Sequence, residues 1–76
     1  MTYTAAERTI TGAILDVPFD AGDEGKSVEF HMSGANYSGV IETYVSPSSV
    51  ILVASPDLPV VDGTITNFFA TDLRWT

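Results

Sequence analysis

The alternation of apolar and polar residues is clearest in the middle of the chain, where two strand-like segments flank a turn. Val40–Val45 alternates in side-chain character and is rich in β-branched and aromatic residues, which is typical of a half-buried strand. Ser46–Ser49 contains Pro47, whose fixed φ suits the second position of a type I turn, and its serines can bond the local backbone. Val50–Ala54 is wholly apolar and too short for an isolated helix, which favours a buried strand. The pattern predicts a central β-hairpin.

Three further segments have the pattern of strands. Thr9–Val17 is a predicted strand in which Gly12 indicates a bulge or a close backbone approach. Ser27–Met32 alternates between apolar and polar residues, as expected of a strand with one buried face. Its inward-facing residues should be Val28, Phe30 and Met32. Thr64–Phe69 is predicted to be the last strand of the chain.

The remaining segments are predicted to be loops and termini. Ser33–Gly39 holds two glycines and an asparagine and is expected to be a loop. Ser55–Gly63 holds two prolines and two aspartates, which predicts a crossing loop with at most a short edge strand at Leu58–Val61. Met1–Glu7 carries little pattern and is interpreted as an arm. The predicted division of the chain is an N-terminal arm at residues 1–8, a β-module at residues 9–69 and a C-terminal tail at residues 70–76.

These segments together indicate the fold class. Five or six short, mainly antiparallel strands with frequent turn signals predict an all-β single domain, either a small barrel or a sandwich. A chain of 76 residues lies near the lower size limit for independent folding, and the absence of cysteine excludes disulfides. We therefore expect a partner to contribute to stability, through oligomerisation or docking onto a larger assembly.

The charge of the chain excludes some classes of partner. Ten acidic residues against three lysines and arginines give a formal charge of −7. This field repels nucleic acid and anionic membranes, so neither is an expected partner, and its simplest role is solubility. Met1–Ile10 is polar and does not have the pattern of a signal peptide, and no apolar run approaches membrane-spanning length. Synthesis in the cytoplasm is consistent with the missing cysteines.

Candidate catalytic and metal-binding residues are few. His31 is the only histidine, lies on the outward phase of a predicted strand, and has no nominated nucleophile or substrate group beside it. Asp20–Gly25 has some of the acidic spacing of a calcium loop but is too short and lacks the closing glutamate. We therefore predict no catalytic residue, metal site or cofactor, and expect that the protein is not an enzyme.

The aromatic residues suggest two kinds of surface contact. Phe68 and Phe69 are adjacent in a predicted strand, so one of them must point away from a one-sided core. The candidate interface residues at the two ends of the chain are Tyr3, Phe68, Phe69, Leu73 and Trp75. The alternative for the C-terminal residues is a tail folded back over the barrel end. Tyr37 and Tyr44 are candidates for stacking on a sugar, with ordinary packing as the alternative; Tyr44 is expected to share a strand face with Val40 and Glu42.

A set of residues resembles a small module of bacteriophage virion proteins, found in the tailspikes and tail fibres of tailed phages. The residues that carry the resemblance are Phe19, Asp23-Glu24-Gly25-Lys26-Ser27-Val28, Gly34, Gly39, Ile41, Ser46-Pro47-Ser48-Ser49, Ile51-Leu52 and Gly63. It covers about residues 9–69, and the Gly-Lys turn with Phe19 upstream is its most specific part. The chain departs from the pattern at Glu24, where an aliphatic residue is usual. It also lacks the long β-helix that carries the saccharide-cleaving site of spikes, so the resemblance implies the structural module and not the enzyme.

The resemblance gives roles to the residues of the turn. Gly25 would permit a sharp turn, Phe19 would plug the barrel from the loop, and Lys26 would bond carbonyl groups or pair with an acid such as Asp23. We accordingly expect a structural turn made by Phe19, Asp23, Gly25 and Lys26.

The resemblance also implies a function. It favours a virion structural protein, foremost a capsid decoration (cement) protein that docks through its termini and an exposed sheet face. Its expected partners are the major capsid protein or a tail protein, and it is expected to form a homo-oligomer, with a trimer as the natural guess. The expected location is the surface of the virion. The alternatives are a tail adaptor or fibre-anchoring module, and a carbohydrate-binding module.

Overall fold

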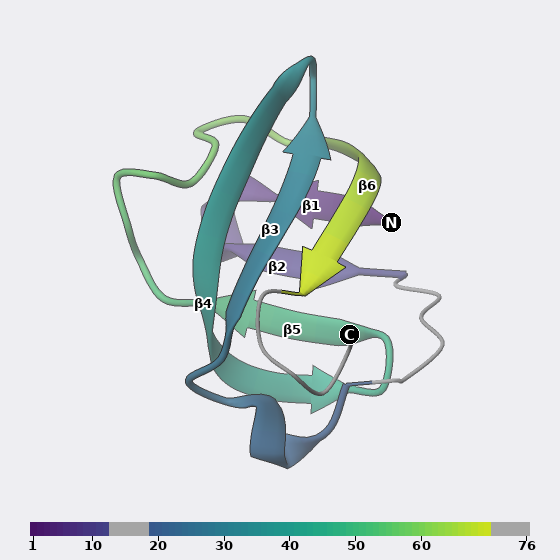
Figure 1. Ribbon diagram of the computed structural model, residues 1–76, viewed down its shortest axis with the longest axis vertical. Coiled ribbons are helices and arrows are strands. Elements are labelled where there is room, and N and C mark those ends of the chain that lie inside the picture. The colour runs from purple at the N-terminus through teal and green to yellow at the C-terminus, as the bar shows by residue number, and fades with distance from the viewer. Residues whose placement is uncertain (13–18, 71–76) are drawn as a thin grey trace.

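The protein is a closed antiparallel β-barrel in the computed structural model (Figure 1). The structure describes residues 1–12 and 19–70, and for residues 69 and 70 it describes the backbone alone. The elements of the described chain, in order, are β1 (Thr2–Thr4), the 3₁₀ turn η1 (Ala5–Glu7), β2 (Thr9–Thr11), the 3₁₀ turn η2 (Ala21–Asp23), β3 (Ser27–Met32), β4 (Ala35–Ser46), β5 (Ser49–Leu52) and β6 (Gly63–Ala70). Around the barrel the strands follow the order β1-β2-β5-β4-β3-β6. The prediction of a small all-β fold of antiparallel strands is therefore confirmed, and of its two forms the barrel is the one observed.

The core lies inside the barrel and is lined by alternate residues of the strands. The buried apolar residues are Tyr3, Ile10, Phe19, Val28, Phe30, Met32, Ile41, Val50, Leu52, Leu58 and Ile65. In β3 the predicted alternation is confirmed, because Val28, Phe30 and Met32 are all fully buried. A strand whose side chains alternate between two faces fills a barrel with one face and leaves the other to solvent.

The N-terminal segment is part of the barrel, which corrects the expectation of an unpatterned arm. β1 pairs with β2 on one side and with β6 on the other, and so closes the barrel. Tyr3 is the middle residue of this strand and is fully buried. One inward-facing aromatic side chain is enough to fix so short a strand, and a single residue makes no periodic pattern in the sequence.

The segment Ser33–Gly39 was expected to be a loop, and this prediction is wrong for most of its length. Only Ser33 and Gly34 form the turn, with φ of 54° and 81°. Positive φ at both central residues is what a two-residue type I′ hairpin requires. Ala35–Gly39 continues as the first part of β4, paired residue by residue with β3 from Met32↔Ala35 onward. Backbone pairing within the sheet here outweighs the low strand propensity of the segment.

The central hairpin is confirmed, with β4 and β5 joined at Pro47 and Ser48. Ser46 Oγ accepts a hydrogen bond from the Ser48 N–H at 3.3 Å, as expected of a serine beside the turn. The register of β4 against β5 shifts twice, so that Glu42 and Val45 are extra residues on β4. Such bulges bend a strand, and β4 curves around the barrel, pairing with β3 at its start and with β5 at its end (Figure 1).

Two glycines allow close packing inside the barrel. A Cβ atom on Gly39 would lie 3.0 Å from Leu58 and 3.2 Å from Leu52, and one on Gly63 would lie 2.8 Å from the Met32 sulfur. The missing side chain at Gly39 leaves room for Leu58, which anchors the long connection between β5 and β6. Leu58–Val61, proposed as a brief edge strand, is loop.

Candidate functional site

The turn that contains Phe19 and Lys26 is held together by side-chain hydrogen bonds and an ion pair. Asp20 Oδ1 accepts from the Gly22 N–H at 2.7 Å, and Asp23 Oδ2 accepts from the Asp20 N–H at 2.9 Å, which together cap η2. Asp23 is fully buried, and the Lys26 ammonium lies 3.6 Å from its Oδ1. A buried carboxylate needs such partners because water cannot solvate it. Pairing of Lys26 with Asp23 was one of the two roles expected for Lys26 from the sequence, the other being hydrogen bonds to carbonyl groups.

The backbone of the same turn is joined to β4. Gly25 has a φ of 91°, a conformation that glycine adopts without strain, and its N–H donates to the Ile41 carbonyl at 2.7 Å. Glu24 Oε2 accepts from the Tyr44 N–H at 2.9 Å. This bond joins the side chain of Glu24 to the backbone of β4.

Phe19 reaches from the turn into the core. Its side chain is 2% exposed, and its ring meets the Phe68 ring edge to face with centroids 5.9 Å apart. The Phe19 N–H donates to the Pro47 carbonyl at 3.0 Å. Phe19 is therefore part of the hydrophobic core, and its role as a plug of the barrel stays a prediction.

The five candidate interface residues do not form one described surface. Tyr3 is buried in the core, so its ring is not available for an external contact. Phe68 is half-buried and packs on Phe19, because its strand directs it inward. The side chain of Phe69, and Leu73 and Trp75 entirely, lie outside the described residues.

The two candidate sugar-stacking residues lie apart and both pack against the core. Phe30 stacks on Tyr37 with ring centroids 5.8 Å apart, and the two residues are directly paired across β3 and β4. Tyr44 is paired with buried Val50, because the bulge at Glu42 turns it to the inner face, which corrects the expectation that it shares a face with Val40. The two tyrosines are seven positions apart along β4, on the order of 20 Å at about 3.3 Å per residue. They do not make one stacking platform.

His31 is held in a surface hydrogen bond. Its Nδ1 lies 2.8 Å from Asn36 Oδ1, on the residue paired with it across β3 and β4. The described residues contain no group of three or more His, Cys, Asp or Glu side chains that could hold a metal ion. No helix in the described part of the chain is long and apolar enough to cross a membrane.

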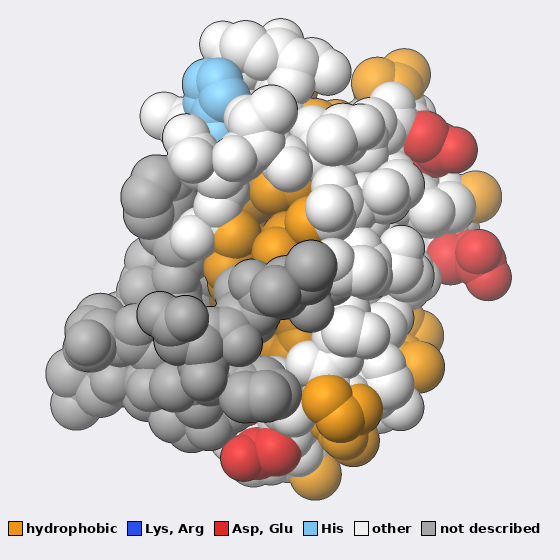
Figure 2. All heavy atoms as spheres, turned by 90° about the vertical axis from the view of Figure 1, so that its right-hand side faces the viewer, with side chains coloured by type: hydrophobic (Ala, Val, Ile, Leu, Met, Phe, Trp, Pro, Cys, Tyr) orange, Lys and Arg blue, Asp and Glu red, His pale blue; other side chains and the backbone are white. Residues whose placement is uncertain are grey.

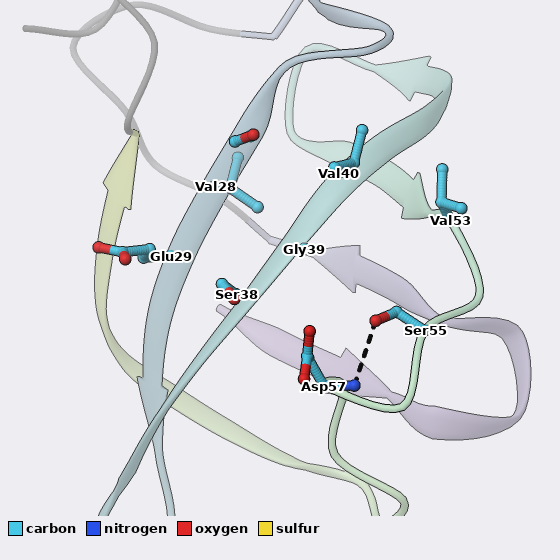
Figure 3. Close-up of a pocket in the computed structure, with 9 residues that line it drawn as sticks. Val28, Glu29, Ser38, Gly39, Val40, Val53, Ser55 and Asp57 are labelled. Carbon is cyan, nitrogen blue, oxygen red and sulfur yellow. Dashed lines mark hydrogen bonds between the residues drawn. The ribbon is translucent and has the colours of Figure 1, made fainter.

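The feature that sequence reasoning did not single out is the outer face of the β4–β5 hairpin. Four apolar residues there point away from the barrel, and we call them the valine face: Val40, Val45, Ile51 and Val53. Val40 and Val53 are joined by a 2.8 Å hydrogen bond from the Val53 N–H to the Val40 carbonyl. Their side chains lie next to each other on the outside of the hairpin (Figure 3). Val40 is 37% exposed, Val53 is 39% exposed and Val45 is 52% exposed.

A hollow of about 440 Å³ borders Val40 and Val53. Its polar groups are the hydroxyls of Ser27, Ser38 and Ser55 and the carboxylates of Glu29 and Asp57. Ser55 Oγ accepts from the Asp57 N–H at 3.1 Å, which fixes the loop side of the hollow (Figure 3). No lysine or arginine lines the hollow, so its charged groups are all negative.

The rest of the described surface is also poor in cations. The Arg8 guanidinium lies 3.8 Å from Glu42, and Lys26 is paired with Asp23. Figure 2 shows a face with hydrophobic side chains at its centre and acidic side chains nearer its edge. None of the described side chains in this view is a lysine or arginine.

A search among protein families, curated proteins and solved structures finds no match to this chain. The only sequence signal for the valine face is the unbroken apolar run Val50–Ala54, which was interpreted as wholly buried. In the structure Val50 and Leu52 are buried, whereas Val53 is exposed. Only part of the apolar run therefore faces the core.

Proposed function

We propose that this protein is a non-catalytic structural module that docks onto a larger protein assembly through its valine face. The observation that carries the proposal is the pair Val40 and Val53, two apolar side chains held together on the outside of the barrel beside an acidic hollow. Their positions face solvent, where threonine or a charged residue would serve the fold equally well. An apolar contact with a polar rim is the usual anatomy of a protein interface.

The chemistry of the rim specifies the partner. Glu29 and Asp57 line the hollow, and Glu42, which pairs with Arg8, lies between the valines of β4, so the residues beside the valine face are mainly acidic. The complementary surface is apolar at its centre and carries lysines or arginines around it. The excess of acidic over basic residues in the whole chain would steer the protein toward such a surface.

We propose further that the assembly is a bacteriophage virion, and that the protein is a capsid decoration protein. This step rests on the resemblance of the turn and strand residues to the phage module, and on the hydrogen-bonded Phe19–Lys26 turn, whose contacts suit a structural role. A position on the tail, as an adaptor or fibre anchor, would use the same face. Immunogold labelling of particles distinguishes the two positions.

Co-sedimentation tests the proposal. Particles from cells that naturally express the protein are separated on a density gradient, and the protein is detected in the fractions. We expect it to migrate with the particles and the double variant Val40→Asp/Val53→Asp to remain at the top of the gradient. The matched control Thr2→Asp/Thr64→Asp adds the same charge at exposed positions outside the valine face and should migrate like the wild type. Wild-type protein found only in the soluble fractions would contradict the virion assignment.

The oligomeric state is a separate part of the proposal. We propose a homo-oligomer, with three-fold symmetry as the arrangement to test. The valine face is an unsuitable self-contact because its acidic rim would face a copy of itself. Light scattering across a dilution series, with melting followed in parallel, should show a trimer whose melting temperature rises with concentration. A monomer at every concentration would contradict this part and leave docking untouched.

A further inference from the structure

A second hollow of about 540 Å³ lies between η1 and the loop that joins β5 to β6. Its apolar walls come from small and aliphatic side chains, among them Ala5, Ala6, Ala54 and Leu58. Arg8, Asp62 and Tyr3 supply polar groups to the same hollow. A concave, mainly apolar site with a few polar groups is the usual form of a small-molecule site.

The hydroxyl of Tyr3 is the unusual group at this hollow. Tyr3 is fully buried, with its ring stacked on Phe30 at 5.7 Å between centroids. Its hydroxyl has no hydrogen-bond partner. Buried polar groups nearly always have a partner, and an orphaned hydroxyl costs free energy that a bound group can recover.

The charges around the hydroxyl restrict the ligand. Arg8 Nε already donates to the Leu52 carbonyl at 3.0 Å, and Asp62 Oδ1 already accepts from the Ala5 N–H at 2.7 Å. The two side chains carry opposite charges, so the site as a whole is neutral. An anion would meet Asp62 and the acidic surface, and a cation would meet Arg8. A tyrosine hydroxyl is protonated at neutral pH, and burial raises the pKa of Tyr3 further, so the hydroxyl can donate a hydrogen bond.

We propose that this hollow binds a small uncharged molecule that has a short aliphatic body and a carbonyl oxygen. The carbonyl oxygen accepts a hydrogen bond from the Tyr3 hydroxyl, and the aliphatic body packs against Ala5, Ala54 and Leu58. This site is distinct from the valine face, because Tyr3 points into the barrel and the valines point out of it.

Tyr3 lines the hollow but its hydroxyl is buried, so a ligand reaches the hydroxyl only if the β5–β6 loop moves outward. Leu58 holds that loop by packing over Gly39, and Asp62 holds it through the bond to Ala5. The ligand should therefore change the environment of Leu58 and Ala5 most.

An NMR titration of the ¹⁵N-labelled chain tests the proposal with three probes that share one carbon skeleton. Isobutyramide is neutral and has a carbonyl group, isobutyrate is an anion, and isobutylamine is a cation at neutral pH. We expect saturable shifts of the Ala5 and Leu58 amide signals with isobutyramide, and affinities for the other two that are weaker by about tenfold. Equal affinity for all three probes, or no saturable shift with isobutyramide, would overturn the proposal.

The variant Tyr3→Phe isolates the hydroxyl. It keeps the ring in the core, and its spectrum reports directly whether the barrel is folded. Binding of isobutyramide should weaken by about tenfold, the effect of one hydrogen bond to a buried donor. Wild-type affinity in a folded Tyr3→Phe protein would contradict the role of Tyr3. Co-sedimentation of this variant should be unchanged, so the result is independent of the proposed docking function.

Discussion

The inner and outer faces of the β4–β5 hairpin carry apolar side chains in opposite surroundings. On the inner face Ile41, Val50 and Leu52 are fully or almost fully buried and Tyr44 packs on the core. On the outer face Val40, Val45 and Val53 are exposed and Ile51 is partly buried. The fold accounts for the inner set, because burial of apolar surface drives folding. It does not account for the outer set, and this difference is the reason to assign the outer face to a partner.

The largest expected loss of stability follows from truncating Phe19, the buried aromatic residue of the turn before β3. Phe19→Ala should lower the free energy of unfolding by about 3–5 kcal/mol, because it removes a buried ring and leaves a cavity. Circular dichroism with urea or heat measures it. Phe19→Leu keeps most of the volume and should lose much less. A melting curve of Phe19→Ala close to that of the wild type would contradict the plug assignment.

Adjacent residues on opposite faces of the hairpin should differ in how much their truncation lowers the free energy of unfolding. Leu52→Ala should cost about 2–5 kcal/mol, whereas Val53→Ala, one residue further along, should change the free energy of unfolding by about 0.5 kcal/mol or less. Chemical denaturation of both variants measures the difference. A similar loss in both would show that the valine face contributes to folding and would remove the argument for a partner.

A smaller loss is expected where a glycine makes room for the core. Gly63→Ala would place a Cβ 2.8 Å from the Met32 sulfur, and overpacking of this kind costs about 1–3 kcal/mol. Combining it with Met32→Val should recover part of the loss, because the two side chains compete for one space. Additive losses in the double variant would indicate that the cost comes from another source.

Alkaline pH should reveal the burial of Tyr3. Its pKa in the folded protein is raised above the ordinary value of 10.0 by desolvation, with Asp62 adding to the rise and Arg8 opposing it. Above pH 10.0 the unfolded chain therefore loses this proton first, and stability falls as the pH rises toward the folded pKa. Melting temperatures between pH 9 and pH 11.5, at roughly half-unit steps, should fall more steeply for the wild type than for Tyr3→Phe. Parallel curves would contradict the raised pKa.

The sequence predicted the fold correctly where the residues of a single segment show the pattern of a strand or a turn. The alternation in Ser27–Met32 and the turn at Pro47 predicted β3 and the central hairpin, because these features are local. β1 was missed because it is held partly by pairing with the distant strand β6 and has Tyr3 as its only core residue. The start of β4 was missed for another reason: it pairs with β3 across the short Ser33–Gly34 turn, but its own residues have low strand propensity.

The candidate site was missed for a related reason. The two bulges in β4, at Glu42 and Val45, change which residues face outward, and they depend on the register against β5. The sequence therefore grouped Tyr44 with Val40, whereas the structure groups Val40 with Val53. The residues of the Phe19–Lys26 turn were found because a positive φ at Gly25 and the charge pair Asp23–Lys26 are encoded within one short segment.

Site-specific photo-cross-linking tests the central claim most directly. A photoreactive amino acid is placed at Val53, or at exposed Thr2 on β1 as the control, and the cells that naturally express the protein are irradiated. The account predicts one dominant cross-linked protein from position 53, with a contact peptide that combines apolar residues with lysine or arginine, and its loss when Val40→Asp is added. Equal cross-linking from both positions, or a contact peptide without basic residues, would contradict the account.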